Sequence, residues 1–90
     1  MIEVMRRPGD DPMTFDVVVS DAGGVTRHRV TMKAADFERL ARGATPERCV
    51  EAAFRFLLDR EPKESILRSF DVSMISRYFP EFEKGLTGYM

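Results

Sequence analysis

The alternation of apolar and polar residues between residues 15 and 33 predicts two antiparallel strands. Both "TFDVVVS" and "VTRHRVTMK" change character at nearly every second residue, which is typical of a strand with one buried face. The two glycines of "DAGG" between them tolerate the backbone angles of a hairpin tip. We therefore expect a hairpin whose inner face carries Phe15, Val17, Val19, His28, Val30 and Met32.

The loop of this hairpin is expected to hold an even number of residues. A two-residue Gly23–Gly24 loop would place Phe15 opposite Met32, whereas a four-residue loop from Asp21 would shift the partners and keep the same faces. A three-residue loop would turn half of the apolar side chains toward solvent. Both even loops remain open. Either one leaves an outer face with Asp16, Val18, Arg27, Arg29, Thr31 and Lys33.

After Lys33, the spacing of the apolar residues lengthens to that of a helix. The segment "AADFERLARG" is expected to be helical up to Gly43, a natural helix stop. A second helix is expected to begin at Thr45, which can cap it, with Pro46 in its first turn. Apolar residues cover well over half of the circumference of this helix. It must therefore be buried from more than one side, as the core helix of the fold.

Two shorter helices complete the predicted order. "PKESILRSF" is expected to begin a third helix at Pro62, and "VSMISRYF" a fourth that ends at Phe79, because the residue before a proline avoids helical backbone angles. No repeat or linker marks a second domain. The sequence thus predicts a single α+β domain over residues 1–90, an N-terminal antiparallel β-hairpin packed on three to four short helices. Weak order is expected in 1–12 and 83–90.

Composition and charge favour an ordinary small globular protein. Its 90 residues allow one domain with a modest core, and 43% hydrophobic with 32% charged residues is typical of a folded chain. The 14 lysines and arginines nearly balance 15 aspartates and glutamates, which argues against broad binding to nucleic acid or anionic membranes. One cysteine and the lack of a long apolar run lead us to expect a cytoplasmic protein with no membrane contact.

Residues that could support catalysis or metal binding are few. His28 and Cys49 are the only residues of their kinds, but Cys49 is expected to pack inside the core helix and His28 to lie near the hairpin tip. One histidine and one cysteine also fall short of the usual four ligands of a metal site. We therefore expect a protein that is not an enzyme, with no catalytic residue, metal or cofactor.

The order of strand, helix, glycine turn and helix over residues 26–60 resembles the ribbon-helix-helix family of DNA-binding proteins. In that family a dimer places a two-stranded ribbon in the major groove. The resemblance implies that arginine and threonine side chains of the strand contact bases, which suits their hydrogen-bonding groups, and that the start of the second helix holds a phosphate. The candidate DNA-binding residues are Arg27, Arg29, Thr31, Lys33 and Thr45.

The C-terminal block "FLLDREPKESILRSFDVSMISRYFPEFE" is similar to that of a set of small uncharacterised bacterial proteins. The resemblance extends over most of the chain from the hairpin onward and leaves out residues 1–12. It implies a bacterial, cytoplasmic, single-domain protein and transfers no functional residue.

We expect the protein to be an interaction module that self-associates as a homodimer or binds another protein. A modest core, an exposed hairpin edge and an aromatic C-terminal end favour this function, with Phe82 and Tyr89 as the candidate interaction patch. A DNA-binding regulator is the alternative. Against it, the strand upstream would already pair with the ribbon strand, and Asp16 and Glu47 would lie near the phosphates.

Overall fold

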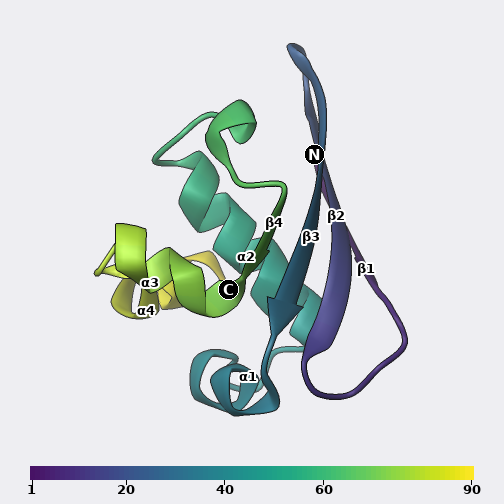
Figure 1. Ribbon diagram of the computed structural model, residues 1–90. Helices are drawn as coiled ribbons and strands as arrows, with labels where there is room; N and C mark the ends of the chain where they lie inside the picture. Colours follow the sequence, from purple (N-terminus) through teal and green to yellow (C-terminus); the bar gives the residue numbers. More distant parts are fainter.

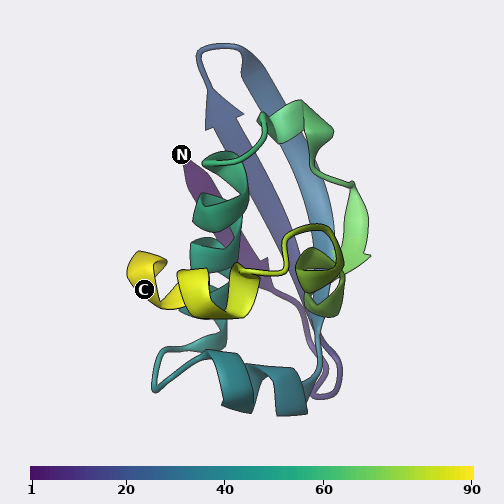
Figure 2. The same cartoon turned by 90° about the vertical axis from the view of Figure 1, so that its left-hand side faces the viewer.

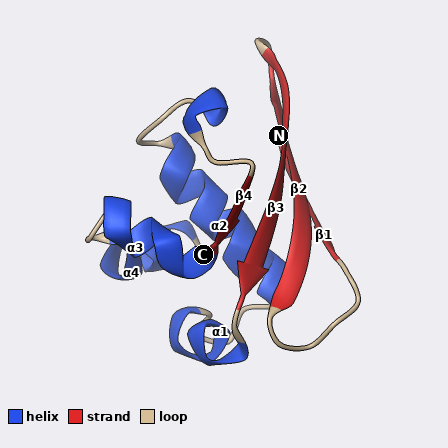
Figure 3. Ribbon diagram, viewed as in Figure 1, coloured by secondary structure: helices blue, strands red, loops and turns tan.

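One four-stranded sheet and one layer of helices make up the protein in the computed structural model, which describes residues 1–90 (Figure 1). The strands lie in the order β1-β2-β3-β4, and all neighbours are antiparallel except β4, which runs parallel to β3. Their bounds are β1 Ile2–Arg6, β2 Met13–Asp21, β3 Gly24–Met32 and β4 Ser69–Asp71. The helices cover one face of the sheet (Figure 3), which confirms the expected α+β class.

The helical layer contains four α-helices and three 3-10 helices. The α-helices are α1 Ala34–Leu40, α2 Pro46–Leu58, α3 Ile75–Tyr78 and α4 Phe82–Gly85. The 3-10 helices are η1 Lys63–Ser65, η2 Val72–Met74 and η3 Leu86–Tyr89. The longest helix, α2, lies between the sheet and the C-terminal segment (Figure 2).

The hairpin of β2 and β3 has the predicted faces and one of the two predicted kinds of loop. Val17 lies opposite His28, and Asp21 lies opposite Gly24, so only two residues form the tip. The register is the one that the four-residue loop predicted, and the additional pair of Asp21 with Gly24 shortens that loop to two residues. The predicted two-residue Gly23–Gly24 loop, which implies a different register, is wrong. Gly24 has a φ of +130°, which explains the need for glycine there. All six residues expected on the inner face are buried, namely Phe15, Val17, Val19, His28, Val30 and Met32.

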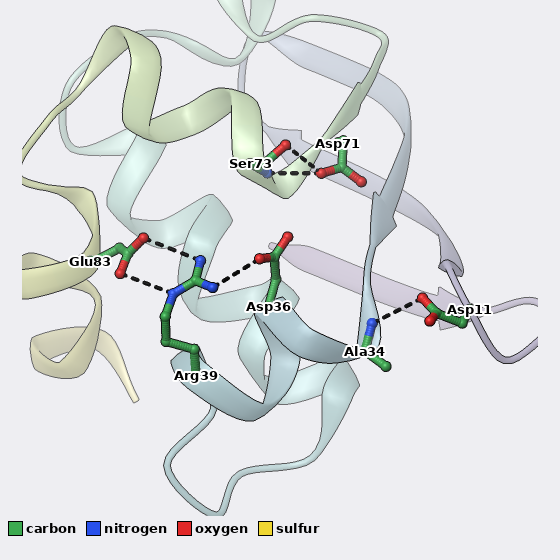
Figure 4. A network of polar contacts seen from close by, with 7 residues as sticks. All are labelled: Asp11, Ala34, Asp36, Arg39, Asp71, Ser73 and Glu83. Atoms are coloured by element: carbon green, nitrogen blue, oxygen red, sulfur yellow. Dashed lines mark hydrogen bonds and ion pairs between the residues drawn. The ribbon is translucent and has the colours of Figure 1, made fainter.

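Weak order was expected in 1–12 and 83–90, and part of each of these ranges carries regular structure. Residues Ile2 to Arg6 form β1, which pairs along the free edge of β2. At the other end, Arg39 of α1 donates two hydrogen bonds of 3.2 Å to Glu83 of α4 and also pairs with Asp36 (Figure 4). The opening residues suggest either a short strand or a tail, and the structure shows the strand. The partner of Glu83 lies 44 residues away, so no local pattern indicates that contact.

The hairpin edge predicted to be exposed is covered only in part, because β1 pairs along β2 but β4 pairs with only a short part of β3. Residues 24–28 of β3 have no neighbouring strand on that side. β1 covers the outer edge of β2, and β4 covers β3 over Arg29–Thr31. The edge strands of the sheet are therefore β1 and β4.

The third helix expected from Pro62 does not form. One 3-10 turn follows Pro62, and the chain then extends into β4. The Arg29 N–H donates to the Arg68 carbonyl over 2.7 Å, so pairing with β3 satisfies the backbone that a helix would have satisfied internally. The prediction for Phe79 is confirmed, because α3 ends before it and its φ of −130° is extended.

The core helix α2 is confirmed together with its cap. Thr45 accepts a 3.1 Å hydrogen bond from the Arg48 N–H, and Pro46 occupies the first turn. The ring of Phe54 packs toward the sheet, with its centroid 5.3 Å from that of His28. The ring of Phe56 instead contacts aromatic residues of the C-terminal segment. This two-sided cover explains why α2 is apolar around most of its circumference.

Candidate functional site

The open face of the sheet carries the basic residues predicted to contact DNA. Arg29 donates a 3.1 Å hydrogen bond to Asp16, and Arg7 donates one of 2.9 Å to the other oxygen of the same carboxylate. These hydrogen bonds, from Arg7 first and then from Arg29, lower the pKa of Asp16. Arg29 thus has an ion-pair partner within the sheet, which it shares with Arg7, so the three side chains keep a net positive charge.

Two further candidate DNA-binding residues also have partners inside the chain. Thr31 donates a 2.5 Å hydrogen bond to Asp71 of β4, and the hydroxyl and N–H of Ser73 donate to the other oxygen of that carboxylate (Figure 4). Burial raises the pKa of Asp71, but the hydrogen bonds from Ser73 and Thr31 outweigh burial and the pKa is lowered. Thr45 caps α2. Lys33 is exposed.

Arg27 borders a polar hollow of about 470 Å³ beside the part of β3 that β4 does not cover. Arg68 and Lys63 also line this hollow. Lys63 is buried and donates to Asp21 over 2.7 Å and to Glu64 over 2.6 Å, so its charge is neutralised. Arg27 and Arg68 take part in no ion pair.

The aromatic C-terminal end is part of the core. Phe82 was a candidate for an exposed interaction patch, but it is only 1% exposed, with its ring centroid 5.1 Å from that of Phe56. Tyr89 is half-buried, and its hydroxyl donates to Asp59. The guanidinium of Arg60 lies 3.5 Å above the Phe56 ring. The prediction of an exposed patch at Phe82 is therefore wrong. Phe56 of α2 points away from the sheet, and the aromatic side chains of the C-terminal segment cover it.

His28 and Cys49 do not form a catalytic pair. His28 Nδ1 donates to the Leu67 carbonyl over 2.8 Å, and its Nε2 lies 2.8 Å from the Thr26 hydroxyl, which can donate to it. Both ring nitrogens are therefore engaged. Cys49 is buried in α2, and burial raises the pKa of its thiol to about 11, so the reactive thiolate is scarce at neutral pH. No group of three or more His, Cys, Asp or Glu side chains is arranged to hold a metal ion.

The most distinctive surface feature is an apolar groove of about 360 Å³ on the helical side. It is lined by residues from the C-terminal end of α2, the η1–β4 segment and α3. Figure 2 shows the ribbons of these elements. Eight of its ten lining residues are hydrophobic. Its floor is formed by the buried side chains of Leu57, Ile66 and Ile75, and its rim by Leu67 and Tyr78, which are 50% and 65% exposed.

Glu61 is the acidic side chain of the groove. It takes part in no ion pair or side-chain hydrogen bond, and burial raises the pKa of its carboxyl above the usual 4.5. The other polar side chains in the lining are the hydroxyl groups of Ser65 and Tyr78, and no lysine, arginine or histidine lines the groove. The groove therefore offers an apolar surface with one carboxylate that lacks a counter-ion.

Sequence patterning missed this groove because a helix was expected at Pro62. Such a helix would have placed Ile66 and Leu67 on a packed apolar stripe. In the structure the segment instead crosses to the edge of β3, where the Leu67 carbonyl accepts a hydrogen bond from the His28 ring. The space beside α2 is thereby left without a covering helix.

No protein-family model, curated protein or solved structure matches the chain. The resemblances noted from the sequence therefore stay predictions. None of the helices has both the length and the apolar character needed to cross a bilayer.

Proposed function

We propose that the protein is a non-enzymatic interaction module that binds a segment of another protein in the apolar groove. The observation that carries the proposal is the exposure of Leu67 and Tyr78 on the rim of a groove with a buried apolar floor. Apolar side chains gathered beside a concave apolar surface are typical of binding sites.

A protein segment suits this groove better than an enclosed small molecule would. The rim residues are half-exposed or more, so a ligand confined to the floor would leave Leu67 and Tyr78 in water. A peptide can place one or two side chains on the floor and cover the rim with its neighbouring residues. The proposal takes the groove as the interaction surface in place of the hairpin edge, which β1 and β4 cover in part, and of Phe82, which is buried.

The contacts of the open sheet face give less support to the DNA-binding alternative. In a ribbon-helix-helix dimer, the ribbon forms between two chains, whereas β3 here lies between β2 and β4 of its own chain. Arg29 and Thr31 already bind Asp16 and Asp71, whose negative charges would face the phosphates.

Selection from a library of random linear decapeptides tests the proposed function. The double variant Leu67→Ser/Tyr78→Ser removes the apolar rim, and the matched control Met5→Ser/Val25→Ser removes two equally exposed apolar side chains of the sheet. We expect enriched peptides that bind the wild-type protein and the control, and that lose at least about tenfold in affinity for the rim variant. Peptides that bind all three proteins equally would contradict the proposal.

A further inference from the structure

Glu61 is held in the groove by the end of helix α2. Its N–H donates to the Leu57 carbonyl over 2.9 Å, which fixes its backbone just beyond the last turn. Other acidic side chains of this region have partners: Glu81 accepts a 3.1 Å hydrogen bond from Arg60, Glu64 accepts one from Lys63, and Asp59 accepts one from the Tyr89 hydroxyl. Glu61 alone faces the apolar lining without such a partner.

Two physical effects act against the negative charge of Glu61 in the free protein. Apolar neighbours remove part of its hydration, which raises its pKa. The carboxyl end of α2 also carries the negative end of the helix dipole, which disfavours an anion close to it. A cation placed in the groove would relieve both effects, because it supplies the missing counter-charge and faces the favourable end of the dipole.

We infer that the bound segment carries a lysine or arginine next to the apolar side chain that fills the groove, and that this cation pairs with Glu61. The inference rests on the proposed function. The lining suits such a side chain. The aliphatic stem of a lysine or arginine can lie along apolar surface while its charged head reaches the carboxylate. The lining also includes the aromatic ring of Tyr78, a group that attracts cations. The partner is therefore a basic-apolar peptide segment.

A double-mutant cycle on the selected peptides tests this inference. The peptides are synthesised with blocked ends and without acidic residues or histidine, and the basic residue is replaced by norleucine. We expect the norleucine change to weaken binding to the wild-type protein by about fivefold and to have no effect on binding to Glu61→Gln. Glu64→Gln is the matched control, since Glu64 already pairs with Lys63 outside the groove. It should leave both affinities unchanged.

The pH dependence of binding gives a second readout. Pairing requires ionised Glu61, so the affinity for the lysine peptide should fall as the pH drops through the raised pKa of Glu61, beginning above pH 4.5. The norleucine peptide should show no such fall. Tyr78 from α3 is the other titratable side chain in the groove, and α2 and the η1–β4 segment add none.

The outcomes separate this inference from the proposed function. Peptides that depend on the rim but show no preference for lysine or arginine, and bind Glu61→Gln equally well, would overturn the inference and leave the groove as a binding site. Failure to obtain any rim-dependent peptide would overturn both. Sedimentation that shows a dimer lost in Leu67→Ser/Tyr78→Ser would identify a second copy as the occupant, and would also overturn the inference.

Discussion

At the scale of single residues, His28 connects two parts of the chain that are far apart in sequence. Its ring donates to the Leu67 carbonyl, lies 2.8 Å from the Thr26 hydroxyl and packs against Phe54. The sequence placed His28 on the inner face of the hairpin because of its alternating position. Its partner Leu67 lies 39 residues away, and no local pattern indicates that contact.

Replacing His28 with alanine should therefore destabilise the fold. The change leaves the Leu67 carbonyl without its donor and opens a cavity beside Phe54, so we expect a loss of about 2–4 kcal/mol in the free energy of unfolding. Urea titration followed by circular dichroism measures it. Arg27→Ala, on the exposed face of the same strand, should change stability by less than about 0.5 kcal/mol. Equal effects of the two variants would contradict this role.

At the scale of elements, the sequence is informative where local chemistry decides the structure. The cap at Thr45 and the end of α3 before Pro80 follow from the preferences of single residues. Gly43, with its φ of +89°, lies in the turn after α1, but Arg42 before it already has a positive φ. The strand β4 could not be predicted in this way. Ile66, Leu67 and Phe70 have the spacing of a helical stripe, and only the free edge of β3 selects the extended form.

The cap of α2 gives a prediction at this scale. Thr45→Ala removes the side-chain acceptor of the Arg48 N–H, and we expect it to lower the free energy of unfolding by about 1 kcal/mol. Thr45→Ser keeps the hydroxyl and should lose much less. Thermal unfolding of the three proteins at one pH gives the comparison. A Thr45→Ala protein as stable as the wild type would show that the cap adds nothing to α2.

At the scale of the whole molecule, the arrangement of the two layers explains both surfaces. The hydrogen-bonded and ion-paired side chains of the open sheet face satisfy one another, as Arg7, Asp16 and Arg29 do. The helical layer is less complete, because the chain between α2 and α3 is drawn toward the edge of β3. The hairpin and its core could be predicted from alternation. The groove could not, since it results from where three segments meet.

The central claim is that this groove is the binding surface, and methyl NMR spectra of the labelled protein titrated with a selected peptide test it most directly. We expect the largest shift changes at Leu57, Ile66, Leu67 and Ile75, which line the groove. The methyl groups of Val18 and Val25 on β2 and β3, which do not line the groove, should stay unchanged. Shifts confined to those two valines, with the groove methyls unaffected, would contradict the account.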